Sequence, residues 1–240
     1  MRLINTVGLA LLASLAVGML ASASASATLG GFECVAGTGN SGLGANCLAE
    51  TGGTFTIKAI TGAKSTGKAV GSTVFATATK QVTCTGGTGE GVVTGPTEGF
   101  GTIKITGCRE GSSGVNCETS GAGAGVLVFP VSTKIVSYLQ NSILKVGLLG
   151  AVRNAAGANE VTIECAGTRV TLYGSVIGSV EPEDTASLSF TGKLVVTQGV
   201  QEIQETTNSL RAKFASGATE KATETGEAVT SFALKVEIMG

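Results

Sequence analysis

Apolar and polar side chains alternate along most of the chain after its first thirty residues. Ile103 and Ile105 alternate with threonine and lysine, and residues 232–238 repeat the pattern near the carboxyl end. A period of two residues predicts antiparallel strands with one face towards a core and the other in water. Thirty-seven glycines punctuate these segments, which favours strands joined by turns. The chain is therefore predicted to be all-β, either an antiparallel β-sandwich or a barrel-like fold.

The longest glycine-poor stretch, residues 126–149, is rich in apolar side chains. Pro130 and Gly147 interrupt it, and Asn141 with Ser142 makes a turn plausible. We interpret the stretch as three successive strands through the middle of the fold. A helix over residues 135–145 is the alternative that the pattern leaves open.

The inward positions of the predicted strands define a core. Its predicted members are Phe55, Ile103, Ile105, Val161, Ile163, Val170, Leu172, Phe190, Phe232 and Leu234. Residues 174–178 are expected to turn tightly and to send Val176 or Ile177 inward. Residues 216–226, which are rich in threonine, glutamate, glycine and alanine, are expected to form an exposed hairpin loop.

The amino-terminal segment has the features of a secretory signal peptide. Arg2 precedes an uncharged apolar stretch at residues 7–20, and alanine alternates with serine up to Ala27. Small residues of this kind are what signal peptidase recognises, and the apolar stretch is shorter than the ~20 residues that span a bilayer. We therefore expect residues 1–27 to be removed, with cleavage after Ala23 or Ala25 as equally compatible alternatives. Residues 28–240 are expected to be one secreted domain with no transmembrane anchor.

Six cysteines follow the predicted signal peptide. An even number in a secreted chain indicates three disulfides, although the spacing alone allows fifteen pairings. Two pairs bracket short loop-like intervals, and the remaining two cysteines lie on separate strand-like segments. The predicted disulfides are Cys34–Cys47, Cys108–Cys117 and Cys84–Cys165.

A weak internal similarity links two parts of the chain. Residues 82–86, Val-Thr-Cys-Thr-Gly, resemble residues 163–167, Ile-Glu-Cys-Ala-Gly, and further short matches follow each segment at a similar offset. Two related β halves, near residues 50–125 and 126–240, would produce this pattern. Chance similarity in a chain rich in glycine and threonine is the open alternative.

The order of several short motifs resembles that in a group of uncharacterised secreted actinobacterial proteins rich in glycine and threonine. The matching segments are Val82–Gly86, Thr106–Cys108, Cys117, Ile163–Gly167, Gly174–Gly178 and Gly199–Gln201. The resemblance implies export, and it implies no activity or functional residues.

Charge excludes some classes of partner. Loss of Arg2 with the signal peptide would leave 15 of the 16 basic residues against 17 acidic ones, a net charge of −2. This balance gives no electrostatic reason to bind nucleic acid. Charged residues make up 14% of the chain, against roughly 25% in ordinary globular domains. Such a surface suits contact with cell-envelope or extracellular components, and the particular partner stays unknown.

Missing residue types limit the chemistry. The chain has no histidine and a single aspartate, Asp184, so Ser-His-Asp catalysis, histidine metal sites and repeated calcium loops are excluded. We expect no cofactor or metal, and no catalytic residue is assigned. The sequence favours a non-enzymatic structural or binding module at the cell surface.

A carbohydrate-active hydrolase is the alternative function, because such enzymes use two carboxyl groups about 5–9.5 Å apart. Glu160 and Glu164 share one face of a predicted strand, and Glu181, Glu183 and Asp184 crowd a turn. A solvated strand face and an exposed acidic turn explain the same residues without catalysis.

Overall fold

The chain forms strands and no helix in the part that the structure describes, so the predicted all-β class is confirmed. The computed structural model describes residues 30–39, 41–45, 50–111, 113–140, 143–154, 157–158, 160–183, 187–194, 200–203 and 206–239. The predicted signal peptide, residues 1–27, lies outside these ranges.

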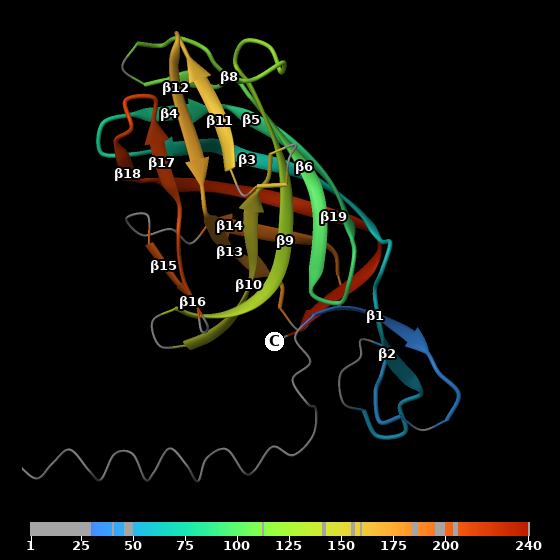
Figure 1. Cartoon of the computed structure of the whole chain (residues 1–240). Coiled ribbons are helices and arrows are strands. Elements are labelled where there is room, and N and C mark those ends of the chain that lie inside the picture. Colours follow the sequence, from blue (N-terminus) through green and yellow to red (C-terminus); the bar gives the residue numbers. More distant parts are fainter. Residues whose placement is uncertain are drawn as a thin grey trace, which may run out of the picture.

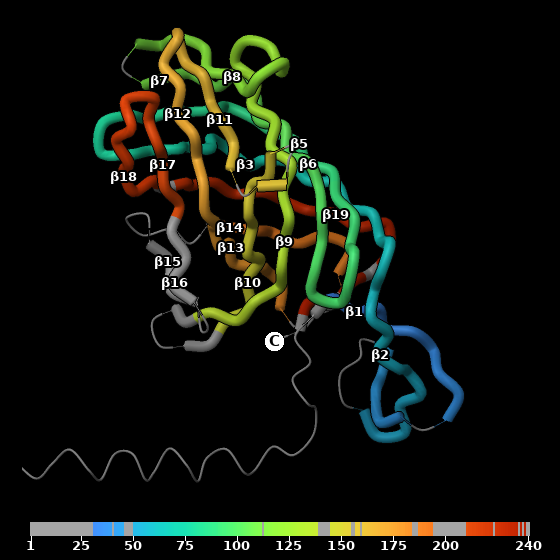
Figure 2. The backbone as a smooth tube through the Cα atoms, viewed as in Figure 1, coloured from blue at the N-terminus to red at the C-terminus, as the bar shows by residue number. Residues whose placement is uncertain are grey.

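Eight strands hydrogen-bond in a closed ring (Figures 1 and 2). They are β3 (Lys64–Ala76), β5 (Gly86–Val93), β6 (Glu98–Thr106), β9 (Val126–Gln140), β10 (Ile143–Val152), β13 (Ser175–Glu181), β14 (Ser187–Leu194) and β19 (Thr223–Met239). Each strand pairs antiparallel with the next in this order, and β19 pairs with β3 to close the ring. The fold is thus an eight-stranded antiparallel barrel. Because the ring is closed, each of its eight strands has a hydrogen-bonded neighbour on both sides.

Short strands extend the barrel wall. β1 (Gly30–Ala36) pairs with the end of β19, and β2 (Phe55–Ala59) pairs with β1 in a hairpin that projects from the barrel in Figure 1. The additional strands are β4 (Gln81–Cys84), β7 (Arg109–Glu110), β15 (Val200–Ile203) and β16 (Thr206–Ser209). β4 continues from the second half of β3, and β7 pairs with β4.

A second, five-stranded antiparallel sheet packs over one end of the barrel. Its order is β18 (Thr219–Lys221), β17 (Arg211–Phe214), β12 (Thr168–Tyr173), β11 (Glu160–Cys165) and β8 (Cys117–Thr119). Along β11, Val161 and Ile163 are buried while Thr162 between them is exposed. The predicted alternation therefore gives this sheet one apolar face, which the barrel end covers.

Two apolar clusters occupy the two ends of the barrel. The disulfide core joins the barrel end to the second sheet, and the distal core fills the opposite end. The disulfide core contains Phe75, Ile105, Leu127, Phe129, Val131, Val161, Ile163, Leu172, Leu210, Ala212, Ala222 and four cysteines. The distal core contains Ile60, Ala63, Ile135, Val146, Val180, Phe190, Val236 and Ile238.

Two of the predicted disulfides are wrong, because the bonds are Cys84–Cys108 and Cys117–Cys165. The predicted pairs Cys108–Cys117 and Cys84–Cys165 assumed that the shortest loop closes first. Strand register decides instead. Cys117 and Cys165 are direct cross-strand partners on β8 and β11.

The second bond follows from the pairing of β4 with β7. Thr83 pairs with Arg109, so the next step along this ladder brings Cys84 opposite Cys108. The Cys117 N–H also donates to the Cys108 carbonyl at 3.0 Å. Each disulfide thus lies within one sheet, Cys84–Cys108 in the extended barrel wall and Cys117–Cys165 in the five-stranded sheet. The four cysteines pack together in the disulfide core, where the two sheets meet.

The third predicted pair falls partly outside the described residues. Cys34 lies on β1 and is disulfide-bonded. Cys47 is not among the residues that the structure describes, so the pairing Cys34–Cys47 stays a prediction.

The stretch at residues 126–149 is strand, not helix, but it forms two strands, β9 and β10, and not three, because neither Pro130 nor Gly147 interrupts them. β9 runs continuously through Pro130, whose carbonyl accepts a hydrogen bond from the Arg153 N–H at 2.7 Å. In an antiparallel strand the N–H and carbonyl of one residue point to the same side. β10 ends at Val152, so the missing proline N–H falls where that neighbouring strand stops. The predicted turn at residues 141–142 lies outside the described ranges.

Two predicted loops are mostly strand. Within residues 174–178, Gly174 adopts a φ of 107° and β13 begins at Ser175, so the tight turn is confined to one residue. In the segment 216–226, a turn with exposed residues at 215–218 is followed by β18 and the start of β19. Consequently Glu224 and Gly226 lie in the barrel wall, not in an exposed loop.

Half of the predicted core is fully buried. The buried members are Ile105, Val161, Ile163, Leu172 and Phe190. Phe55, Val170, Phe232 and Leu234 are only half-buried. Ile103 was predicted to be buried, yet 38% of its surface is accessible. The reason is that Ile103 lines an internal space.

Candidate ligand cavity

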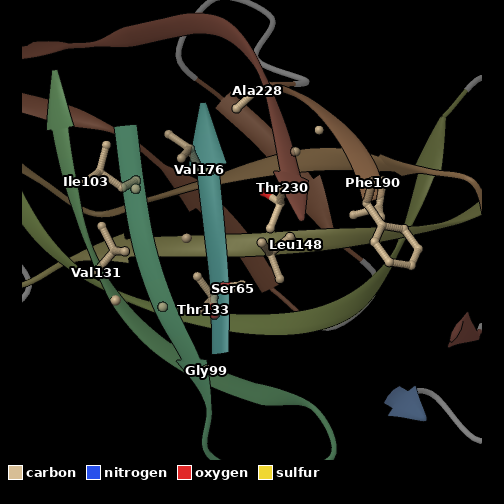
Figure 3. Close-up of a pocket in the computed structure, with 18 of the residues that line it drawn as sticks. Ser65, Gly99, Ile103, Val131, Thr133, Leu148, Val176, Phe190, Ala228 and Thr230 are labelled. Atoms are coloured by element: carbon tan, nitrogen blue, oxygen red, sulfur yellow. The ribbon is translucent and has the colours of Figure 1, made fainter. Parts of the chain in front are cut away.

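The barrel interior contains a cavity of about 380 Å³ between the two cores. All eight strands of the ring contribute to its lining, and the second sheet adds Leu172. Figure 3 shows Ile103, Val131, Leu148 and Val176 extending into this space from four different strands. The volume falls in the range of about 300–1,000 Å³ that is typical of small-molecule sites.

Glycine at inward-facing positions creates the space. Inward positions alternate along each strand, and glycine replaces a larger side chain at ten of those in the lining. These are Gly67, Gly87, Gly89, Gly91, Gly99, Gly101, Gly150, Gly178, Gly192 and Gly226. Eight-stranded barrels are otherwise narrow enough for side chains to fill. The glycines therefore keep this barrel hollow in the middle.

The glycines serve two different purposes. A Cβ on Gly101 would lie 2.4 Å from the Glu90 carbonyl oxygen, and one on Gly99 would lie 2.7 Å from the Thr133 Oγ1. These two positions permit close packing of the wall. A Cβ on Gly67 or Gly89 would meet no atom nearer than 3.7 Å, so a side chain at either position would begin with ordinary van der Waals contacts and no clash.

Most of the lining is apolar. Ile103 and Leu148 each have 38% of their surface accessible although both belong to the barrel interior. Their accessible surface faces the cavity, as Figure 3 shows. Apolar side chains that border a cavity lack partners on that side and lose dispersion contacts, which an apolar ligand would restore.

A small set of hydroxyl groups adds polarity to one part of the wall. Ser65 of β3, Thr133 of β9 and Thr230 of β19 all belong to the lining, and Figure 3 shows them between the apolar side chains. Gly67 pairs with Thr230 in the β3–β19 ladder. A few polar groups in an apolar pocket orient a ligand without dominating its affinity.

One carboxyl group faces the cavity at the end that borders the disulfide core. Glu224 pairs across the ladder with Phe75, and it shares the inward face of β19 with Gly226 and Ala228. Its side chain makes no hydrogen bond or ion pair with any described residue. Burial raises the pKa of Glu224 from 4.5 to about 7.

The other carboxylates near the wall point outward. Glu90, Glu98 and Glu227 also border the cavity. Glu90 and Glu98 are nevertheless exposed and alternate with inward glycines on β5 and β6, so their side chains point outward. Glu227 pairs with Lys193 at 3.4 Å on the outer surface. Among the described carboxylates, Glu224 is thus the one that the strand alternation turns into the barrel.

The carboxylates that the sequence singled out do not line the cavity. Glu164 forms an ion pair with Arg169 at 2.8 Å, and Glu160 accepts a hydrogen bond from the Asn154 side chain at 3.1 Å. Both lie on β11 in the second sheet. Glu183 lies 3.8 Å from Lys145 and Glu181 is exposed, while Asp184 lies outside the described residues.

The buried carboxylate Glu110 has a structural role. Glu110 forms an ion pair with Lys80 and accepts a hydrogen bond from the Ser113 hydroxyl at 2.5 Å. The hydrogen bonds from Lys80 and Ser113 lower the pKa of Glu110. This pair ties β7 to the loop before β4 and leaves Glu110 no unpaired oxygen for chemistry.

The described side chains include no group of three or more histidine, cysteine, aspartate or glutamate residues that could hold a metal ion. Nor does any helix in the described ranges have the length and apolar character to cross a membrane. The two disulfides fit an oxidising compartment.

Sequence reasoning missed the cavity and Glu224. Alternating glycine at Gly87, Gly89 and Gly91 was available as a signal, since a period of two places all three on one face of a strand. The sequence prediction instead places glycine in the turns between strands. Glu224 carried no comparable signal, because its surroundings match those of an exposed loop.

Comparison with protein-family models, with curated proteins and with solved structures finds no match for this chain. The resemblance to secreted actinobacterial proteins therefore stays an expectation from the motifs, and the functional argument depends on the cavity alone.

Proposed function

We propose that this protein is a secreted, non-enzymatic binding module whose barrel holds a small apolar ligand. The observation that carries the proposal is the cavity of about 380 Å³ with its mainly apolar lining. An apolar ligand of matching size would remove this surface from water, which contributes roughly 25 cal/mol for each Å² buried. Export follows from the predicted signal peptide and agrees with the disulfides.

The arrangement favours binding over hydrolysis. Glycoside hydrolysis needs two convergent carboxyl groups. Four described glutamates border the cavity, but strand alternation turns only the Glu224 side chain inward, while those of Glu90, Glu98 and Glu227 point outward. Glu160 and Glu164 are engaged with Asn154 and Arg169 on the second sheet. No observation among the described residues favours the hydrolase alternative.

The first test is binding of a neutral fluorescent probe. N-phenyl-1-naphthylamine becomes fluorescent in apolar surroundings, so we expect its emission to rise and saturate at one probe per chain of residues 28–240. Absence of saturable binding of this probe, and of aliphatic ligands by calorimetry, would contradict the proposed function.

Filling the cavity should abolish probe binding. Gly67→Phe places an aromatic ring in the interior, because a Cβ at Gly67 has no neighbour nearer than 3.8 Å. We expect affinity for N-phenyl-1-naphthylamine to fall at least about tenfold, while the free energy of unfolding stays equal or rises by about 1 kcal/mol. Fluorescence titration and urea denaturation measure the two effects.

Thr66→Phe is the matched control, because Thr66 is the exposed, outward-facing neighbour on β3. This variant should bind the probe as the unchanged protein does. Equal loss of binding in both variants would show that the probe binds elsewhere.

A further inference from the structure

We propose that the ligand of this cavity is an apolar amine, with its ammonium group bound by the Glu224 carboxylate. The inference deepens the proposed function and rests on it: the cavity supplies the apolar site, and Glu224 supplies selection by charge.

The first argument is the isolation of Glu224. Its cross-strand partner is Phe75. Leu172 of the second sheet and Leu210, which precedes β17, also line this end of the cavity. No described residue donates a hydrogen bond to the carboxyl group or pairs with its charge. Glu224 is half-buried, and its side chain faces a mainly apolar interior. A carboxylate in such surroundings without a partner is costly, and a ligand cation would supply that partner.

The second argument is that no cation of the protein competes for this position. Lys68 and Lys193 both border the cavity. Lys68 is exposed on β3 between the inward Gly67 and Ala69, so strand alternation turns its side chain outward. Lys193 of β14 is exposed and pairs with Glu227 on the outside. Among the described residues of the strands packed against Glu224, no lysine or arginine side chain therefore points towards its carboxyl group. The positive charge can come from a ligand instead.

The third argument concerns the type of head group. An ionised carboxyl group only accepts hydrogen bonds, whereas an ammonium group offers three donors and a complementary charge. An alcohol offers one donor without charge, and a carboxylate ligand would be repelled. With the pKa of Glu224 near 7, about half of the groups are ionised at neutral pH, and an ammonium ligand would draw the rest into the ionised form.

The test compares three probes that share one chain and differ in the head group: decylamine, decanol and decanoate. Each displaces N-phenyl-1-naphthylamine from the protein comprising residues 28–240, and isothermal calorimetry in two buffers of different ionisation enthalpy counts the protons released. We expect decylamine to bind at least about tenfold more tightly than decanol at pH 8, with decanoate the weakest. Decylamine should release about half a proton at pH 7, and decanol none.

Glu224→Gln supplies the decisive variant, since it keeps the shape of the side chain and removes the charge. It should bind decylamine at least about tenfold more weakly, bind decanol unchanged, and release no proton. In the unchanged protein, affinity for decylamine should rise about thirtyfold from pH 5.5 to pH 8 as Glu224 ionises.

The possible results separate the two proposals. Equal affinity for decanol and decylamine, or a Glu224→Gln variant with unchanged preference, overturns the amine inference while leaving an apolar binding protein. Failure of all three probes and of N-phenyl-1-naphthylamine overturns the proposed function itself. Unchanged decanol binding by Glu224→Gln verifies that the variant is folded.

Discussion

Replacing Cys117 and Cys165 together by alanine should lower the free energy of unfolding by about 4 kcal/mol. Their disulfide closes 48 residues, and loop-closure entropy in the unfolded chain gives this magnitude. Alanine is used because a serine hydroxyl at these buried positions would lack a hydrogen-bond partner. Urea denaturation without reducing agent measures the change.

The matched comparison is the alanine pair at Cys84 and Cys108. Their bond closes 24 residues, so the expected loss is smaller, about 3.5 kcal/mol. Peptide mapping of the unreduced protein should recover Cys84 linked to Cys108 and Cys117 linked to Cys165. A peptide joining Cys108 to Cys117 would contradict the strand register on which both values depend.

The disulfide pairing shows where local sequence reasoning ends. Strand alternation is a property of neighbouring residues, and β11 with its buried Val161 and Ile163 follows the predicted pattern. Pairing of Cys117 with Cys165 depends on which strands lie side by side. That arrangement is set by packing of the barrel against the second sheet, which no local pattern contains.

The same distinction separates the barrel from the sandwich. Alternation indicates which face of a strand is apolar, and both a sandwich and a barrel bury such a face in their core. Closure depends on β19 pairing with β3 across about 150 residues of intervening chain, together with the right register. The sequence therefore predicted the class and left the two architectures open.

The cavity could have been predicted from the glycines of the sequence. Gly87, Gly89 and Gly91 occupy alternate, inward-facing positions on β5. Gly150 on β10 and Gly192 on β14 also face the cavity. In a turn, glycine supplies positive φ, but none of these five positions has a positive φ. They matter through the side chains they lack.

Stability should fall as pH rises from about 4.5 to about 7, and Glu224→Gln should remove this dependence. Because burial raises the pKa of Glu224 from 4.5 to about 7, the folded protein binds more protons than the unfolded chain between these values. The stabilisation is fully present below pH 4.5 and is lost as pH rises through the folded pKa, by about 3 kcal/mol in total.

Urea denaturation of the ligand-free protein from pH 4.5 to pH 8.5 measures this effect. We compare the free energy of unfolding of Glu224→Gln with that of the unchanged protein at each pH. This difference should be about 3 kcal/mol more in favour of the variant at pH 8.5 than at pH 4.5. Glu90→Gln, at an exposed outward position on β5, is the control and should follow the unchanged protein. Glu110 affects stability in the opposite direction. Because its pKa is lowered, protonation below pH 4.5 removes its pairing with Lys80 and lowers the free energy of unfolding as pH falls. The two carboxyl groups therefore affect separate pH ranges. A difference between Glu224→Gln and the unchanged protein that stays constant from pH 4.5 to pH 8.5 would show that Glu224 does not face the apolar interior.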